Sequence, residues 1–437
     1  MNMKMASILC LVIMLAGCVA GQQRGLVGDT YVSSSQPALA LKARDLPLMG
    51  SMTGASRLTS SGAMGGLLVD SWVTVYGKGD GASPLAIVAH GEVPNGWYWD
   101  GIMRHPFSIN EGVETIGGVE AAYEYTRRCL MAGKHVVTAN KQLVAEHGCE
   151  LLELARKNHV NYLFEASVGG GIPVLHPLTQ CMAANRVDEI YGILNGTTNF
   201  ILTKMVKEGA SFAEVLKLAQ EKGYAEADPT ADVEGIDAGR KICILADLAF
   251  GHQVDPAQVP MEGITGIDLK DVEIAGRHGY RIKLLGRCLR LEGGRRTAYV
   301  APHLISEENP MSDVNDVFNA VVVRGNATGE VMFYGKGAGE LPTASACVAD
   351  VIECLQEERH RPEIGWSADT GGFASPLTLK NRWYFRVGAD TLPEALHSAK
   401  LLEQGTETAF ITPPITGTDA EQLAAYLPTL AKMRVLD

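Results

Sequence analysis

The sequence lacks the residue patterns that several common classes of protein need. Its nine cysteines are scattered, with no CxxC pair and no histidine cluster at metal-ligand spacing. The pattern therefore indicates neither a zinc site nor a disulfide framework, and it favours small buried thiols in a reducing compartment. Basic residues are also in deficit, because 38 Lys and Arg stand against 50 Asp and Glu for a net charge of -12. This argues against nucleic acid or an anionic membrane as a partner and favours a small molecule.

Long hydrophobic runs are scarce as well. The apolar run at residues 8–15 is too short to span a membrane. The sequence LAGC at residues 15–18 follows it and has the form of a bacterial lipoprotein signal, with Cys18 as the lipid acceptor. Two interpretations stay open here: an exported lipoprotein, or a buried first strand and helix.

The first quarter of the chain lacks a dinucleotide-binding signature. Residues 22–111 are rich in Gly, Ser, Pro and Ala, and they predict no sustained helix or strand. The fragments GAMGG at 62–66 and GKGDG at 77–81 resemble phosphate loops. The first follows no convincing strand. The second follows a plausible strand at 72–76, but no helix after it could point its N-terminus at a pyrophosphate, so both are interpreted as turns.

From residue 112 the pattern changes to an alternation of strands and helices. The predicted strands lie at 113–116, 135–139 and 162–166, and the predicted helices at 120–132 and 142–157. Such a βαβαβ unit forms a parallel sheet that binds ligands at the carboxyl ends of its strands. Gly117, Asn140 and Lys141 fall at such ends.

The whole chain has 437 residues and 46% hydrophobic content, so the part after this unit has room for one or two more domains. Strand character is predicted at 190–194, 266–275, 282–290, 297–304, 317–324 and 332–334, and helices at 200–208, 211–222 and 343–354. After Ser375 a compact α+β unit is expected, with strands at 383–387, 408–411 and 433–436 and helices at 392–404 and 419–430.

Charged residues are most concentrated at 223–241, which reads GYAEADPTADVEGIDAGRK. Its first half is rich in Asp, Pro and Thr and predicts a loop, and the second half predicts a helix that ends at Gly251. Asp237 and Lys241 are four residues apart, so their side chains leave one face of that helix. From spacing alone, they form either a site for one small molecule or an ordinary surface ion pair.

Residues 112 to about 357 resemble homoserine dehydrogenases. The stretch at 223–241 fits that family's signature, and the following runs are similar to the family in the same order: IGGVEAAYEY, GKHVVTANK, FEASVGGGIP, GILNGTTNFILTKM and MFYGKGAGELPTASA. The family interconverts L-homoserine and L-aspartate 4-semialdehyde with NAD or NADP, on the route to threonine, methionine and isoleucine. The resemblance therefore implies an oxidoreductase, and it favours a functional site at Asp237 and Lys241.

The resemblance implies catalytic and substrate-binding roles for five residues. Lys241 would exchange a proton with the substrate hydroxyl or aldehyde oxygen. Asp237, together with Glu226 and Asp232, would hold the substrate's ammonium group or orient that lysine. Lys141 would be a second lysine, near both the nicotinamide and the substrate.

The resemblance also implies binding sites for a dinucleotide and a cation. Gly117 and Gly339 would border the NAD or NADP. A monovalent cation such as Na⁺ would bind at a backbone-rich site formed by Glu165, Val168, Gly170 and Ile172.

The implied fold is α/β with three parts. A Rossmann-like nucleotide-binding domain would occupy residues 1–160, atypical before 112, followed by an α+β substrate and dimerisation domain at 161–357. A small ACT-like regulatory domain would occupy 380–437. A cytoplasmic homodimer or homotetramer is the implied form, and the LAGC sequence is then accidental.

The two ends of the chain depart from the family. The family begins with a strand and a GxGxxG turn that opens a helix, and residues 1–111 have neither. A shifted reading frame in the coding sequence would explain this. So would a replaced N-terminal half, which would make the chain a catalytically silent, amino-acid-binding homologue. The C-terminal unit has no DKPGVL-type loop and one predicted strand fewer than the usual βαββαβ order.

Overall fold

A computed structural model of the chain describes residues 119–355, 365–396 and 398–436, together with strands β1–β7 between residues 24 and 114. Gly117, the LAGC sequence and the two phosphate-loop-like fragments lie outside the described residues. The chain divides into two compact units: unit 1 is Met1–Leu143, Glu150–Phe164 and Cys347–Glu363, and unit 2 is Val144–Cys149, Glu165–Ala346 and Ile364–Asp437. Among the described helices, none has the length and apolar character needed to cross a membrane.

Unit 1 contains the predicted βαβαβ alternation. Its elements are β7 (Glu111–Glu114), α1 (Glu120–Met131), β8 (His135–Thr138), α2 (Lys141–Lys157) and β9 (Tyr162–Leu163). The three strands form a parallel sheet in the order β7-β8-β9. Val136 and Val137 of the central strand are buried, as expected for a parallel strand covered by helices.

The strands that precede residue 93 form two separate antiparallel sheets, β1-β2-β3 and β4-β5-β6. Their bounds are β1 (Arg24–Val27), β2 (Thr30–Ser33), β3 (Leu39–Leu41), β4 (Leu48–Leu58), β5 (Leu67–Tyr76) and β6 (Ala86–Glu92). The prediction of no sustained strand in this part is therefore wrong, although the short strand expected at 72–76 lies within β5. Gly and Ser recur along β4, and residues of low strand propensity weaken the pattern on which that prediction depends.

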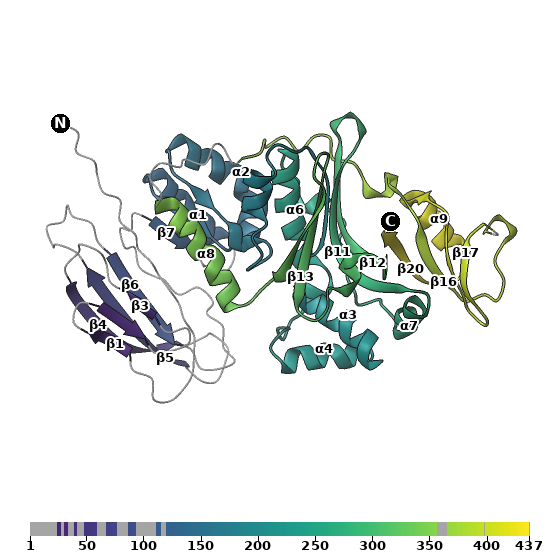
Figure 1. The fold of residues 1–437 in the computed structure, drawn as a ribbon, viewed down its shortest axis with the longest axis horizontal. Helices are drawn as coiled ribbons and strands as arrows, with labels where there is room; N and C mark the ends of the chain where they lie inside the picture. Colours follow the sequence, from purple (N-terminus) through teal and green to yellow (C-terminus); the bar gives the residue numbers. More distant parts are fainter. Residues whose placement is uncertain are drawn as a thin grey trace. The chain divides into compact units, whose positions relative to one another are not determined.

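Unit 2 is built on a nine-stranded sheet with the order β14-β13-β10-β11-β12-β20-β16-β18-β17. Figure 1 shows it continuing from the green strands into the yellow C-terminal ones. Neighbouring strands are antiparallel except for β12 and β20, where Leu304 lies opposite Val435 in a parallel pair. The bounds are β10 (Val187–Ile193), β11 (Tyr280–Arg290), β12 (Arg296–Ser306), β13 (Phe318–Gly325), β14 (Gly329–Lys336), β16 (Trp383–Val387), β17 (Lys400–Gln404), β18 (Thr408–Ile411) and β20 (Thr429–Leu436). Strands β15 (Lys380–Asn381) and β19 (Ile415–Thr416) form a separate two-stranded antiparallel sheet.

Helix α6 packs on one face of β10, β11 and β12. Gly286 of β11 allows the close approach, because a Cβ there would lie 3.2 Å from the Cβ of Ile242 on α6. Leu285 points to the opposite face, where it joins a cluster with Tyr191, Ile305 and Val322. The helices of this unit are α3 (Gly196–Glu208), α4 (Phe212–Glu221), α5 (Thr230–Val233), α6 (Ile236–Phe250), α7 (Leu269–Arg277) and α9 (Gly417–Tyr426). Helix α8 (Glu340–Leu355) has residues in both units.

The strand predicted at 266–275 is wrong, because these residues enter helix α7. Asp268 caps the helix, since its carboxylate accepts a hydrogen bond from the N–H of Lys270 at 2.8 Å. Val272 and Ala275 are buried at helical spacing, so this amphipathic pattern was present in the sequence.

The helix predicted at 392–404 is also wrong. The chain there forms a single 3₁₀ turn, Glu394–Leu396, and then the edge strand β17. Leu401 pairs with Phe410 across β17 and β18, so a partner strand distant from the local pattern decides the structure. The C-terminal element order is consequently strand, 3₁₀ turn, strand, strand, helix, strand, with four strands in the sheet order β20-β16-β18-β17.

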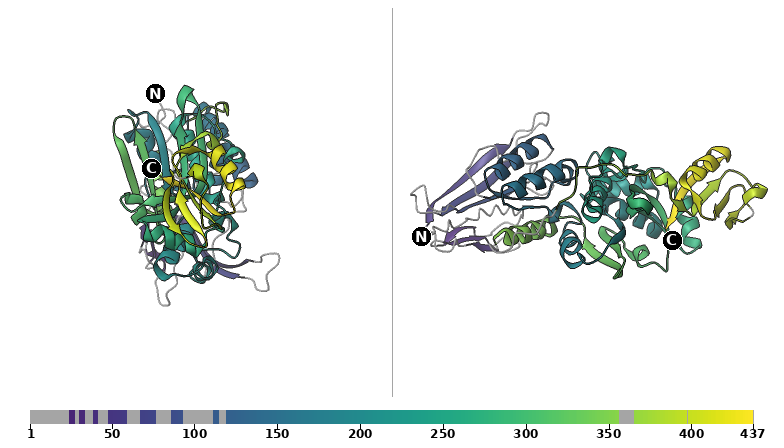
Figure 2. Two further views of the ribbon diagram at one scale, coloured as in Figure 1. Left: turned by 90° about the vertical axis from the view of Figure 1, so that its right-hand side faces the viewer. Right: turned by 90° about the horizontal axis from the view of Figure 1, so that it is seen from above.

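The C-terminal strands and α9 share a core with one another. Figure 2 shows the yellow helix α9 lying along the yellow strands. Ala420 of α9 packs with Phe385 and Phe410, whose rings stack at 5.5 Å. A buried ion pair also joins these strands to the rest of unit 2. Arg386 of β16 donates hydrogen bonds to both carboxylate oxygens of Asp271 on α7, at 2.7 and 2.9 Å.

Candidate functional site

Lys241 and Asp237 form a buried pair on α6. The Lys241 Nζ lies 2.7 Å from Asp237 Oδ2, and the two side chains are 9% and 7% exposed. The same Nζ donates a hydrogen bond of 2.8 Å to the carbonyl of Leu194, at the end of β10. Helix α6 begins after Gly235 (φ 79°) and ends at Gly251 (φ 73°), and this end is the one that the sequence predicts. The surface-ion-pair interpretation of these two residues is therefore wrong.

Asn195 joins a second acid to this pair. Its Nδ2 donates to Asp237 Oδ2 at 2.9 Å and to Asp232 Oδ1 at 2.7 Å, so one amide group holds two carboxylates. Its Oδ1 caps helix α3 by accepting from the N–H of Thr198 at 2.8 Å. The start of α3, the loop before α6 and the first turn of α6 are thereby fixed around Lys241.

The environment of Asp232 favours its neutral form. Burial raises the pKa of this carboxyl, and the charge of Asp237 raises it further. The hydrogen bond from Asn195 and the charge of Lys241 act in the opposite direction. A cation arriving beside Asp232 would therefore relieve an unfavourable charge, which suits this site to an ammonium group.

Thr197 connects the loop at 223–229 to α3. Its Oγ1 donates a 2.6 Å hydrogen bond to the carbonyl of Tyr224. Neither Asn195 nor Thr197 is among the site residues that the sequence predicts. The signal for both was the run GILNGTTNFILTKM, in which an Asn directly before a helical apolar pattern marks a helix N-cap.

Glu226 stands apart from the other predicted substrate-binding acids. Its side chain is exposed, and its backbone carbonyl accepts a 3.0 Å hydrogen bond from Gln220 Nε2. Within the described residues, its carboxylate makes no hydrogen bond to Asp232, Asp237 or Lys241. The structure thus brings together three of the four residues predicted around the substrate in unit 2.

Lys141 is the first residue of α2 in unit 1. Asn140 caps that helix by accepting from the N–H of Leu143 at 3.0 Å, and its own N–H donates to Thr138 Oγ1 at 2.9 Å. Lys141 therefore emerges half-buried at the carboxyl end of β8, which is where ligands of parallel sheets bind. The structure does not describe the neighbouring candidate Gly117.

The predicted cation site is a buried turn in unit 2. Glu165 Oε1 accepts from the N–H groups of Val174 and Leu175 at 2.6 and 2.9 Å, and Oε2 accepts from that of His176 at 2.7 Å. A carboxylate offers about four lone-pair positions, so these contacts leave little capacity for a cation. Val168 and Ile172 are buried, and Gly170 turns the backbone between them with φ 55°. The residues fit a cation through backbone carbonyls better than through Glu165.

A glycine-rich loop follows β14 in unit 2. Gly339 has φ 119°, and its carbonyl accepts from the N–H of Thr343 in the first turn of α8 at 3.0 Å. A Cβ on Gly170 would lie 2.5 Å from the carbonyl oxygen of Gly337, so the two glycine segments are in contact. Only glycine permits this approach of backbone to backbone.

Two family models match the chain. The model described as Homoserine dehydrogenase matches residues 173–352, which contain the Lys241 cluster. The model described as Homoserine dehydrogenase, NAD binding domain matches residues 110–165, which contain β7, β8 and β9.

Curated homoserine dehydrogenases are similar to this chain over more than half of its length. The protein of Bacillus subtilis is 49% identical over 247 residues, which are 56% of this chain and 57% of that protein. The protein of Neisseria gonorrhoeae is 50% identical over 301 residues, covering 67% of this chain and 69% of the relative.

A solved homoserine dehydrogenase from Thiobacillus denitrificans has the same architecture, with a TM-score of 0.69 and 37% identity over 75% of this chain and 82% of the other. The match to the Bacillus subtilis protein spans less than two thirds of that relative, whereas the match to the Neisseria gonorrhoeae protein exceeds that share. The chain belongs to the homoserine dehydrogenase family.

Proposed function

We propose that this chain is an NAD(P)-dependent homoserine dehydrogenase that interconverts L-homoserine and L-aspartate 4-semialdehyde. The observation that carries the proposal is the buried Lys241 Nζ, held between Asp237 Oδ2 and the Leu194 carbonyl. This ammonium group is fixed in position inside the region that the family model matches.

Lys241 is the acid and base of the reaction. It gives a proton to the aldehyde oxygen in one direction and takes one from the hydroxyl in the other, and its charge stabilises a developing alkoxide. Asp237 and Leu194 fix the direction of Nζ, so little reorganisation is needed at the moment of transfer.

Asp232 holds the substrate's ammonium group. Its partly buried carboxylate gains from a cation because burial and Asp237 disfavour its charge. Glu226 joins it from the exposed loop when substrate is present, since loops that carry binding residues commonly close over a ligand.

NAD or NADP, when bound, supplies the hydride chemistry that the side chains cannot. The match of residues 110–165 to an NAD-binding family model supports this cofactor. Lys141, Gly117 and Gly339 border it, and Lys141 stands at a strand's carboxyl end, as such a role requires. A monovalent cation binds through the backbone carbonyls around Val168, Gly170 and Ile172, with Glu165 organising the turn.

The chain has three functional parts: residues 1–160 for the nucleotide, 161–357 for substrate and dimerisation, and 380–437 as an ACT-like regulatory domain. The strand order β20-β16-β18-β17 with helix α9 supports the last of these, because it is the order of a βαββαβ unit. The enzyme works in the cytoplasm as a homodimer or homotetramer, in the synthesis of threonine, methionine and isoleucine.

The proposal is tested by measuring homoserine-dependent reduction of NAD and of NADP with the full chain. Turnover with either cofactor supports it. A titration of NADPH fluorescence runs beside it, because quenching that saturates shows that the cofactor site works. No turnover with either cofactor, despite saturable NADPH binding and correct folding, would overturn the proposal.

A further inference from the structure

Asn319 carries a buried amide whose oxygen has no partner. It is the second residue of β13 and is 1% exposed, and its Oδ1 has no hydrogen-bond partner among the described residues. An unpaired polar atom inside a protein costs about 1–3 kcal/mol. A residue with only a packing role would be better served by an apolar side chain, so this amide calls for a functional explanation.

Glycines surround this amide on two sides. A Cβ on Gly337, in the loop after β14, would lie only 1.9 Å from Asn319 Nδ2. A Cβ on Gly196, the first residue of α3, would lie 3.6 Å from Asn319 Oδ1. The unpaired oxygen therefore faces the start of α3, next to Asn195, which holds both Asp232 and Asp237.

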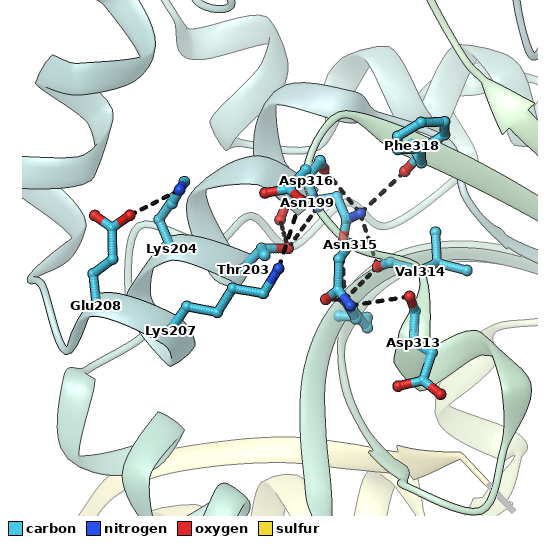
Figure 3. Close-up of polar contacts among 11 residues, drawn as sticks. Asn199, Thr203, Lys204, Lys207, Glu208, Asp313, Val314, Asn315, Asp316 and Phe318 are labelled. Carbon is cyan, nitrogen blue, oxygen red and sulfur yellow. Dashed lines mark hydrogen bonds and ion pairs between the residues drawn. The ribbon is translucent and has the colours of Figure 1, made fainter.

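The segment that leads to Asn319 is clamped in place. Asn199, on the second turn of α3, directs its Nδ2 at the carbonyls of Val314, Asp316 and Phe318 at distances of 3.0, 3.1 and 3.0 Å (Figure 3). Lys283 Nζ donates to the Val314 carbonyl at 2.6 Å and to Asn199 Oδ1 at 3.1 Å. With the backbone of residues 314–318 fixed to α3, the amide of Asn319 has little freedom to turn toward another partner.

We propose that Asn319 is a substrate-binding residue whose Oδ1 accepts a hydrogen bond from the ammonium group of the amino-acid substrate. The inference rests on the proposed function and extends its site by one residue from β13. The position beside the acid cluster favours the substrate over the cofactor. The Asn319 oxygen would accept a hydrogen bond from the same ammonium group that the carboxylates of Asp232 and Asp237 attract.

The experiment compares homoserine with 4-hydroxybutyrate, the analogue that lacks the amino group. In Asn319→Leu of the full chain, the KM for homoserine rises about tenfold or more, since hydrogen bonds to charged groups contribute at least that much. Protection against thermal unfolding by homoserine falls in parallel, while the weak binding of 4-hydroxybutyrate stays unchanged. The Tm of the free variant stays equal or rises, because the unpaired amide is gone.

Asn326→Ala is the matched control, because Asn326 is exposed in the turn between β13 and β14. If Asn319→Leu leaves the homoserine KM and the thermal protection by homoserine unchanged, the inference is overturned, and water is then the only hydrogen-bond partner of Asn319 Oδ1. Weaker NADPH binding with unchanged homoserine KM would overturn it too, since the amide would then serve the nicotinamide carboxamide. If the wild-type chain itself neither oxidises homoserine nor gains thermal stability from it, the proposed function fails and the inference falls with it.

Discussion

Lys241 Nζ and Asp237 Oδ2 lie 2.7 Å apart, one turn from each other on α6, and each side chain is less than a tenth exposed. Exposed pairs of this spacing contribute about 0–1 kcal/mol and are common on helix surfaces. A buried pair is different, because removing one partner leaves the other charge without compensation. The pair is therefore expected to respond strongly to substitution in activity and in structure.

Replacing Lys241 with Ala removes the proton donor and acceptor. The value of kcat should fall by about a hundredfold to ten thousandfold, which is the usual contribution of a positioned acid or base. NADPH binding, followed by fluorescence quenching, should change little. Arg240→Ala is the control, because Arg240 is the neighbouring residue on α6 and lies outside the cluster. A Lys241→Ala enzyme with nearly unchanged kcat would remove Lys241 from the mechanism.

The raised pKa of Asp232 predicts a pH dependence of substrate binding. Burial and the charge of Asp237 raise this pKa, so the folded chain holds the Asp232 proton more tightly than the unfolded chain does. The stability from this group is thus present at low pH and is lost as pH rises through the folded pKa. Homoserine needs the charged carboxylate, so its KM should rise as pH falls through the same range.

Asp232→Asn should remove that pH dependence. The measurement is the KM for homoserine from about pH 4 to about pH 8, in wild type and variant. The variant should have a higher KM at neutral pH and a flatter acid limb. Asp228→Asn is a suitable control, since Asp228 is exposed in the same loop. Identical acid limbs in wild type and Asp232→Asn would contradict the assignment.

Local patterns predicted the elements that depend on nearby residues. Strands β16 and β18 match their predicted ranges, and α6 ends at the glycine expected for it. The loop at 223–229 and helix α6 were predictable because Asp, Pro and Thr interrupt a helix and the apolar run after Gly239 sustains one. The short helix α5 (Thr230–Val233) inside the predicted loop was not predicted. These signals act within a few residues, so tertiary contacts do not override them.

Contacts between distant residues were not predictable in the same way. The residues before Gln404 have a helical pattern, but in the structure they form strand β17 because β18 is available as a pairing partner. The bridge from Asn195 to Asp232 and Asp237 joins residues about 40 positions apart, and the glycine surround of Asn319 joins three separate segments. The periodicity of apolar residues in the sequence does not predict contacts between residues so far apart. The family resemblance indicated some of the residues but none of the hydrogen bonds.

The ion pair between Asp271 and Arg386 should be essential for anchoring β16 to α7. Tyr384 also donates to Asp271 Oδ1, at 2.7 Å, so the buried carboxylate has three donated hydrogen bonds. Asp271→Ala removes two hydrogen bonds of the buried Arg386 guanidinium, which keeps Glu407 as a partner at 2.8 Å. The free energy of unfolding should fall by about 3 kcal/mol, because hydrogen bonds to charged groups contribute about 1.5–3 kcal/mol each. Urea unfolding measures this loss.

A matched exposed pair separates burial from charge in that experiment. Glu273 and Arg277 lie one turn apart on the same helix, 3.8 Å from each other, and both side chains are exposed. Glu273→Ala should cost about 0–1 kcal/mol. Equal losses in the Asp271 and Glu273 variants would show that the buried pair does not anchor the C-terminal strands.

Lys283 should make folding stability depend on pH in the alkaline range. Burial, with smaller contributions from the charges of Arg281 and Lys207, lowers its pKa from 10.5 to about 8, and the charges of Asp313 and Asp316 act in the opposite direction. Between about pH 8 and pH 10.5 the unfolded chain binds the Lys283 proton and the folded chain does not. Unfolding therefore takes up a proton, so this residue's contribution to stability grows as pH rises through that window, by about 3 kcal/mol in total.

Lys283→Met removes the titrating group and so removes this slope. Its unfolding free energy, measured in urea at several pH values, should fall behind that of wild type by an amount that increases from pH 8 upward. Lys157→Met is the control, because Lys157 pairs with Glu153 on α2 with its side chain 65% exposed, and its variant should follow the wild-type slope. Parallel curves for wild type and Lys283→Met would mean that Lys283 titrates as an ordinary lysine. The hydrogen bonds that join Asn199 to residues 314–318 would then stabilise the fold equally across this pH range, because the Lys283 amine would not change its proton occupancy on unfolding.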